Sequence, residues 1–246
     1  MIALQRFTRH GDPDAFQRFL QLKYEVFVDE QAWPLPGDPV QRIAAEDPQD
    51  AKSCFILASD EFGAAGVVRG TMLNQAFPRR ELLEHHLDRG RIHIRFDELA
   101  TINSIAVRHA LRGKLCDISG QSTPTTIAKA LMCELAVWCR EQGALALVFT
   151  AIRGVSAVFF EHLGAYVLDP LARMHGVEHE LLNMALLLQD PDRFRQQGSP
   201  LLRLCPQRPL TPDEVDCQRY CRERHAQILN GAAMDQFVFA GLSAPR

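Results

Sequence analysis

Hydrophobic and polar residues follow one another along the chain in two kinds of pattern. Short apolar segments rich in β-branched residues are typical of strands, whereas apolar residues repeated every three or four positions predict helices. Strands are expected at residues 1–7, 53–59, 65–72, 98–107, 144–150, 165–168 and 181–188, and helices are expected to begin near residues 12, 122, 155 and 211. This order predicts an α/β fold with a central mixed, twisted sheet flanked by helices.

The first helix is marked at its start and along one face. Asp12 followed by Pro13 is typical of an N-cap with proline at the first helical position. Apolar residues then recur at helical spacing, at Phe16, Leu20, Tyr24 and Phe27. Three prolines and a glycine follow Trp33, so the segment up to Asp50 is expected to form an ordered or gated loop.

A strand, a basic turn and a capped helix follow one another between Glu98 and Thr126. We expect Ser122 or Thr123 to cap this helix and Gly143 to end it. One face of the helix carries an apolar stripe. The next strand, ALALVFT, is apolar throughout, which is typical of a strand buried on both faces in a parallel crossover. Such a unit suits a phosphate-bearing ligand, because backbone N–H groups and a helix N-terminus face its turn.

Two further segments of the sequence have a distinct composition. Residues 78–95 are rich in arginine, which indicates a solvated helical excursion or, alternatively, a landing surface for an acidic partner. Five prolines between residues 191 and 212 break up the chain, and one helix is expected at the capping box from Thr211 to Glu214. We therefore expect one domain at 1–190 and an extension at 191–246 packed on it.

Composition and charge restrict the class of protein. A formal net charge of −3 argues against a bulk nucleic-acid binder, and no apolar run approaches the length of a membrane span. Arg6 and Arg9 interrupt any apolar signal region, and seven cysteines without scaffold spacing indicate reduced thiols. A cytoplasmic protein is expected.

No metal site is expected, although two patterns resemble one. The run from His175 to His179 fits a zinc pattern that requires a helix, and Gly176 disfavours a helix there. Cys217 and His225 lie on one predicted helix face but roughly 12 Å apart along its axis, too far to bind one ion.

The motifs AVRHALRGK, ALALVFT and AVFFEHLGA, in this order, resemble the core of the GCN5-related N-acyltransferase (GNAT) superfamily. The resemblance covers roughly residues 53–170. It implies that a strand, a phosphate-binding turn and a helix hold the pantetheine arm of an acyl thioester.

A second group of residues resembles the N-terminal half of the acyl-homoserine lactone (autoinducer) synthases, which share this fold. These residues are Val26, Phe27, Trp33, Glu46, Asp47, Asp50, Gly66, Arg69 and Glu98. The resemblance implies transfer of an acyl chain, usually from acyl carrier protein, to an amine, and it extends to N-acyl amino acid synthases.

Some positions depart from these families. Lys23 stands where the synthases carry an arginine, and a lysine cannot reproduce a bidentate guanidinium contact. Ala100 and Thr101 replace a Ser-Arg pair, so production of homoserine lactone is in doubt. Leu115 and Asp117 replace glycines that let a backbone wrap a pyrophosphate, which favours a donor with a single phosphodiester.

The chemistry of amide formation requires a base, because an amine nucleophile must lose a proton before it attacks a thioester. Glu98 is the expected base, and its structural alternative is a strand-end carboxylate paired with a nearby arginine. The oxyanion needs a donor, which we expect to be a backbone N–H near Ile105 to Val107, where this fold commonly has a bulge. Phe159 and Phe160 occupy the region where many acetyltransferases carry a tyrosine acid.

The remaining site residues are assigned to the two substrates. The acceptor is expected to contact Phe27, Trp33, Glu46, Asp47, Asp50, Arg69 and Thr101, and the acyl donor to contact Ile105, Ala106, Val107, Arg108, Arg112, Gly113, Lys114 and Phe149. The structural alternatives are a core position for Trp33 and an ion pair between the loop and the sheet for Arg69 and the aspartates.

The predicted activity is N-acyl transfer from acyl carrier protein or acyl-CoA to an amino acid or a related amine. No permanent cofactor is expected, because acyl-CoA or acyl-phosphopantetheine is the substrate. The alternatives are an acetyl-CoA-dependent acetyltransferase and a non-catalytic sensor that binds acyl thioesters. Chain length, acceptor and oligomeric state are left open.

Overall fold

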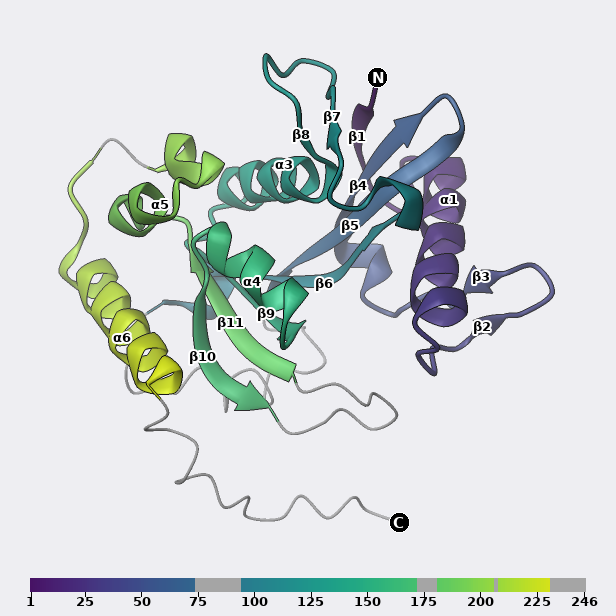
Figure 1. Cartoon of the computed structure of the whole chain (residues 1–246). Helices are drawn as coiled ribbons and strands as arrows, with labels where there is room; N and C mark the ends of the chain where they lie inside the picture. The colour runs from purple at the N-terminus through teal and green to yellow at the C-terminus, as the bar shows by residue number, and fades with distance from the viewer. Residues whose placement is uncertain (74–93, 172–180, 206–207, 231–246) are drawn as a thin grey trace, which may run out of the picture.

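The computed structural model describes residues 1–73, 94–171, 181–205 and 208–230. One seven-stranded sheet has the order β1-β4-β5-β6-β9-β11-β10 (Figure 1). Its strands are β1 (Ala3–Phe7), β4 (Ser53–Asp60), β5 (Gly63–Leu73), β6 (Leu99–Val107), β9 (Ala146–Ile152), β10 (Tyr166–Leu171) and β11 (Leu181–Leu187). Among the described strands of this sheet only the β6–β9 pair is parallel, which confirms the predicted mixed sheet.

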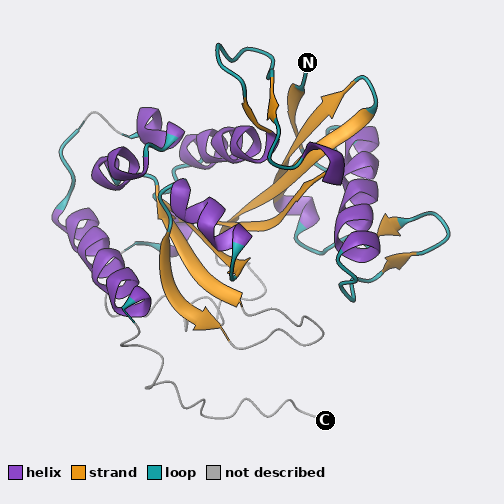
Figure 2. Cartoon of the chain, in the orientation of Figure 1, coloured by secondary structure: helices purple, strands orange, loops and turns teal. Residues whose placement is uncertain are grey.

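Helices cover both faces of this sheet, as Figure 2 shows. Side chains alternate across a strand, and on β4 Phe55 and Leu57 pack in one core with α1 (Pro13–Tyr24). Ile56 and Ala58 pack in the other core with α3 (Ile127–Glu141). α1 and α3 therefore lie on opposite faces of the sheet.

The start of α1 follows the predicted chemistry. The Asp12 carboxylate accepts a hydrogen bond from the Ala15 amide at 2.9 Å, and Pro13 takes the first helical position. The helix was expected to include Phe27, but α1 ends at Tyr24 and a π-helix follows at Glu25–Glu30. A small hairpin of β2 (Gly37–Asp38) and β3 (Ile43–Ala44) lies in the expected loop.

The predicted start of the central helix is wrong. Thr126, not Ser122 or Thr123, is the N-cap of α3, and its hydroxyl accepts a hydrogen bond from Lys129 N at 3.4 Å. The reason is a second small hairpin, in which β8 (Thr125–Thr126) pairs with β7 (Leu115–Cys116). Because Thr125 and Thr126 are extended in this hairpin, the helix begins only at Ile127.

The last part of the chain packs against the far edge of the sheet. α4 (Val155–His162) precedes β10, and α5 (Pro191–Gln197) follows β11. α6 (Pro212–Leu229) begins at the predicted capping box and runs along β10 (Figure 1). α5 was not predicted, although Asp190 and Pro191 repeat the signal of Asp12 and Pro13.

Some expectations fall on other parts of the chain. The arginine-rich segment at 78–93 and the pattern from His175 to His179 lie outside the described residues. Within the described ranges, no helix is long and apolar enough to cross a membrane.

Candidate functional site

The parallel pairing of β6 and β9 is short. Leu99, Ala100 and Thr101 pair with Ala146, Leu147 and Val148, and the pairing ends there. β6 stays paired with β5 up to Val107, and β9 stays paired with β11 up to Ile152. The two strands therefore separate inside an otherwise continuous sheet, and their facing edges can bond an extended ligand.

The direction of the β6 amides follows from one hydrogen bond. Arg108 N donates to Ala65 O of β5 at 3.0 Å. Because amide directions alternate along a strand, the N–H groups of Val107 and Ile105 point away from β5, to the side where β9 has separated. These are the amides that the sequence pointed to as oxyanion donors.

A bulge lies close to these amides, but not at the predicted residues. The β5–β6 register shifts so that Arg69 pairs with Ser104 and Gly70 with Ile102. Asn103 is therefore the extra residue, two positions before Ile105. The expected bulge at Ile105–Val107 is corrected to Asn103.

The N-terminus of α3 lies over this end of β6. A Cβ atom built on Gly66 would lie 2.6 Å from Ile127 Cγ2, and Gly66 pairs with Val107. The first residue of α3 thus packs directly on the strand pair that carries the Val107 amide. This close approach brings a helix N-terminus beside the amides.

The basic turn after β6 is held by the protein itself. Arg108 forms an ion pair with Asp60 at 3.3 Å. Arg112 donates to Val107 O at 2.8 Å and forms an ion pair with Glu30 of the π-helix. Both guanidinium groups therefore fix the turn. Gly113 adopts a φ of +71°, a backbone conformation that favours glycine. Lys114, the next residue, is exposed.

Phe149 lies on β9 directly after the last residue paired with β6. It is buried and packs in a tilted arrangement on Phe160 of α4, with 4.4 Å between ring centroids. It belongs to the core on the α3 face together with Ile102. Its side chain is thus part of the wall where the two strands separate.

On the opposite face of the sheet, a buried ion pair joins the loop to β5. Arg69 Nη1 lies 2.5 Å from Asp50 Oδ1, and Arg69 Nη2 lies 3.6 Å from Asp47 Oδ2. Asp50 is 0% exposed and Arg69 is 4% exposed. This geometry confirms the structural alternative for these residues. Asp47 differs from Asp50 because 37% of its side chain is exposed.

Lys23 lies next to this ion pair and is itself buried. Burial first, and then the charge of Arg69, lower the pKa of Lys23. The lysine thus adds a second cation to the group formed by Arg69, Asp47 and Asp50.

Trp33 packs on Phe27 with 5.0 Å between ring centroids, in the core that α1 shares with Val67 of β5. This agrees with a core position for Trp33. Trp33 Nε1 and Arg69 Nε are nevertheless buried without a hydrogen-bond partner among the described residues. Buried donors normally have partners, so these two atoms are exceptions in this part of the structure.

The other predicted acceptor residues are not all in this group. Thr101 pairs with Thr71, two residues from Arg69 on the same face of β5, so it lies nearby. Glu46 instead forms an ion pair with Arg9 and is partly exposed.

Glu98 lies outside the strand that was expected to hold it. It ends a 3-10 helix at Phe96–Glu98, where its carboxylate accepts a hydrogen bond from Arg95 N at 3.1 Å. Ser104 is the β6 residue that pairs with Arg69. Leu99, which follows Glu98, is five positions before Ser104, so Glu98 lies at least roughly 16 Å from Ser104 along the strand. The partner of Glu98 is a backbone amide rather than an arginine side chain.

No known protein-family model matches the sequence, and no curated protein matches it. The fold has clear relatives among solved structures. TofI, in a ternary complex with an inhibitor and MTA, is 13% identical with a TM-score of 0.58, over 82% of this chain and 100% of TofI. BjaI, a CoA-dependent acyl-homoserine lactone synthase with SAM and isopentyl-CoA, is 17% identical with a TM-score of 0.57, over 90% of this chain and 99% of BjaI.

A third solved structure widens the class. ElaA of Escherichia coli is 17% identical with a TM-score of 0.50, over 75% of this chain and 99% of ElaA. The chain therefore has the GNAT-like fold that the sequence predicted. Within that class it is similar in fold to the acyl-homoserine lactone synthases.

Proposed function

We propose that this protein is an N-acyltransferase that moves an acyl group from an acyl thioester to the amine of an amino acid or a related small molecule. The observation that carries the proposal is the separation of β6 from β9 after three residue pairs, with the Ile105 and Val107 amides directed into it. An extended pantetheine arm can bond such strand edges. The nearby α3 N-terminus favours its phosphate.

The acceptor lies, in this proposal, on the face that carries Arg69. Its carboxylate would take the unpartnered donors Arg69 Nε and Trp33 Nε1, and half-exposed Asp47 would bind its ammonium group. Both contacts are charge-assisted hydrogen bonds, which are stronger than neutral ones.

Two carboxylates are candidates for the base that deprotonates the amine. Glu98 is the residue that the sequence favours. Asp47 is favoured by its position beside Arg69 and by its partial exposure. The base must come within hydrogen-bond reach of the amine, directly or through one water, so replacing each carboxylate in turn distinguishes them.

The proposed donor is a carrier-bound acyl chain. Arg112 is already held by Glu30 and by Val107 O, so its guanidinium has little capacity left for a pyrophosphate. A phosphopantetheine with one phosphodiester requires only the α3 N-terminus and Lys114. Acyl-CoA is the alternative donor.

The experiment that tests the function is turnover measured by mass spectrometry. Purified protein is incubated with acyl-CoA or acyl carrier protein and a panel of amino acids and S-adenosylmethionine. We expect an acylated amine, and a loss of kcat of at least about 100-fold in either Glu98→Gln or Asp47→Asn. Glu223→Gln, an exposed carboxylate on α6, is the control and keeps full activity.

The same experiment separates the alternatives. A preference for acetyl-CoA over longer donors would identify an acetyltransferase. Saturable binding of an acyl thioester without any turnover would instead identify a sensor and overturn the catalytic proposal.

A further inference from the structure

A second cluster of charged residues lies at the far edge of the sheet, between β10, α5 and α6. Its cavity has a volume of about 450 Å³ and is lined by Tyr166, Asp192, Arg193, Gln196, Arg222 and His225. Three strands separate β10 from β5, so the two strands lie roughly 19 Å apart across the sheet at a spacing of about 4.8 Å, and none of the lining residues belongs to β5, β6 or β9. It is distinct from the proposed acyl-transfer site.

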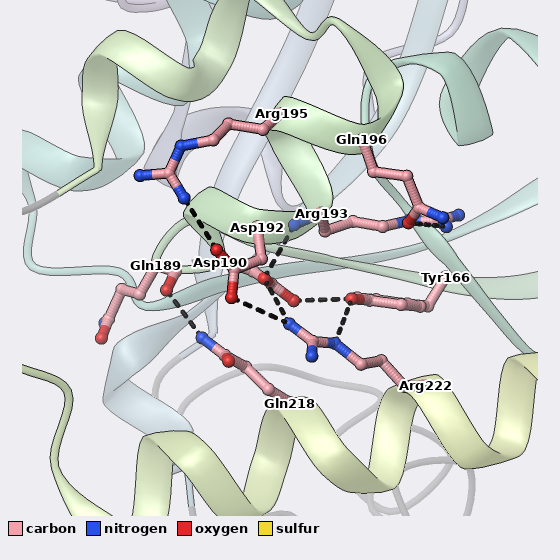
Figure 3. Close-up of polar contacts among 9 residues, drawn as sticks. All are labelled: Tyr166, Gln189, Asp190, Asp192, Arg193, Arg195, Gln196, Gln218 and Arg222. Carbon is pink, nitrogen blue, oxygen red and sulfur yellow. Dashed lines mark hydrogen bonds and ion pairs between the residues drawn. The ribbon is translucent and has the colours of Figure 1, made fainter.

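Asp190, a buried carboxylate beside this cavity, already has its hydrogen-bond partners, as Figure 3 shows. Asp190 is 1% exposed and accepts hydrogen bonds from Tyr166 Oη at 2.6 Å, Arg193 N at 3.0 Å and Arg222 Nη2 at 3.0 Å. The negative charge of Asp190 is therefore balanced by Arg222.

Arg193, in contrast, is a buried cation without a carboxylate partner among the described residues. It is 8% exposed, and its guanidinium contacts Gln196 Oε1 at 3.4 Å, Ala165 O at 3.2 Å and the face of the Tyr166 ring. All three contacts are uncharged. Arg193 Nε is buried and has no hydrogen-bond partner in the described part of the chain. A buried unpaired charge is costly, so this arginine requires an anion.

His225 adds a second donor at the same wall. Val167 N donates to His225 Nδ1 at 3.0 Å, so the proton of the neutral ring lies on Nε2. His225 Nε2 is 3.3 Å from Arg193 Nη2, which also only donates. Two donors that face each other cannot bond, but one oxygen between them can accept from both.

We propose that this cavity binds an oxyanion of the phosphate class, held by Arg193 and His225 with Arg222 at its rim. Arg193 Nε, Arg193 Nη2 and His225 Nε2 supply three donors, whereas a water molecule has only two lone pairs and no charge. Guanidinium groups match the oxygens of phosphate in geometry. The cavity is larger than a free phosphate, which leaves room for the rest of a phosphate monoester. Hydroxyl groups of that part would donate hydrogen bonds to the exposed carboxylate of Asp192.

The test is the binding of inorganic phosphate to the whole protein, measured by isothermal titration calorimetry at pH 7 and constant ionic strength. We expect one saturable site. Arg193→Lys, which keeps the charge but removes Nε, and His225→Gln are each expected to weaken binding at least tenfold. Arg219→Gln is the control, because Arg219 is exposed on α6 and paired with Asp216, and neither residue lines the cavity; it should bind as the wild type does.

A nuclear magnetic resonance titration of His225 in the wild type gives a second readout that needs no variant. Burial and the charge of Arg193 lower the pKa of His225 to about 4. Bound phosphate must raise it, because an anion stabilises the imidazolium. An unchanged His225 titration, absence of saturable binding, or binding that is lost in Lys114→Gln and kept in His225→Gln would each overturn the proposal.

Discussion

Arg69 and Asp50 illustrate how one pair of residues serves both stability and the proposed site. Their ion pair is almost completely buried, with Arg69 4% and Asp50 0% exposed. Buried pairs of this kind contribute little relative to apolar residues, but removing one partner strands a charge in the core.

We therefore predict that Asp50→Asn lowers the free energy of unfolding by about 3 kcal/mol. Urea denaturation followed by circular dichroism measures this change. Arg219→Gln, which removes an exposed pair with Asp216, is the control and should change stability by less than about 1 kcal/mol. Equal effects of the two substitutions would show that Asp50 is not a buried partner of Arg69.

His225 makes stability depend on pH. Its pKa is about 4 in the folded protein and 6.5 in the unfolded chain, so between these values the unfolded chain binds more protons. The free energy of unfolding should thus be constant above pH 6.5 with respect to this group and fall by up to about 3 kcal/mol as the pH drops to 4. His225→Gln should remove this slope in urea denaturation at a series of pH values. Parallel slopes would contradict the assignment.

At this scale the sequence predicted residue types better than their roles. Arg69, Asp47 and Asp50 were expected together and lie together, because they precede or belong to adjacent strands. The position of Glu98 was less accessible, since its partner is the backbone of Arg95 three residues away and no side-chain pattern specifies that turn.

The packing of α3 on β5 depends on two glycines of the strand. A Cβ atom at Gly70 would lie 2.5 Å from Leu135 Cδ1, and one at Gly66 would lie 2.6 Å from Ile127 Cγ2. Real contacts are longer than this, so the helix can approach the sheet only because both side chains are absent.

We predict that Gly70→Ala lowers the free energy of unfolding by about 1–3 kcal/mol through overpacking. Leu135→Ala alone should cost about 2–5 kcal/mol because it leaves a cavity. The double variant should be more stable than the sum of the two effects implies, since the new methyl group fills part of that cavity. Strict additivity in denaturant titrations would show that the two positions do not touch.

Element types were predictable where their signals are local. Asp12 with Pro13 and the box from Thr211 to Glu214 specified two helix starts by hydrogen bonds within one turn. The start of α3 at Ile127 was not predictable, because it depends on pairing between β7 and β8 residues that are nine and eleven positions apart in the sequence. The separation of β6 and β9 is equally hidden, since ALALVFT is as apolar as a strand paired on both sides.

The reactivity of the cysteine thiols depends on how deeply each one is buried in the core. Cys116 is half-buried, and the other six cysteines are buried. Burial raises the pKa of the Cys54 thiol to about 12 and also raises those of Cys133 and Cys139. Because the thiolate is the reactive form, native protein treated with iodoacetamide should be alkylated first at Cys116. Peptide mass spectrometry gives the order, and early labelling of Cys139 would contradict the described core.

At the scale of the molecule, apolar and charged contacts attach the described residues after 190 to the edge of the sheet. Cys217 and Cys221 of α6 belong to one core with Tyr166 and Leu168 of β10. Arg222 of α6 balances the buried charge of Asp190, the N-cap of α5. We therefore propose that the described part of this extension, residues 191–205 and 208–230, folds together with the domain rather than as a separate appendage.

Removal of residues 208–246 tests this proposal. The truncation exposes apolar surface on β10 and leaves Asp190 without its arginine, and loss of one partner of a buried pair alone costs about 3–5 kcal/mol. Native domains are stable by only about 5–15 kcal/mol, so the truncated chain should lose its cooperative unfolding transition. Arg222→Met in the full chain isolates the charge from the apolar contacts and should lower the urea midpoint while keeping a single transition. A truncated protein with the wild-type midpoint would mean that the sheet is complete without α6, and the last helix would then have to be explained by a partner or a ligand.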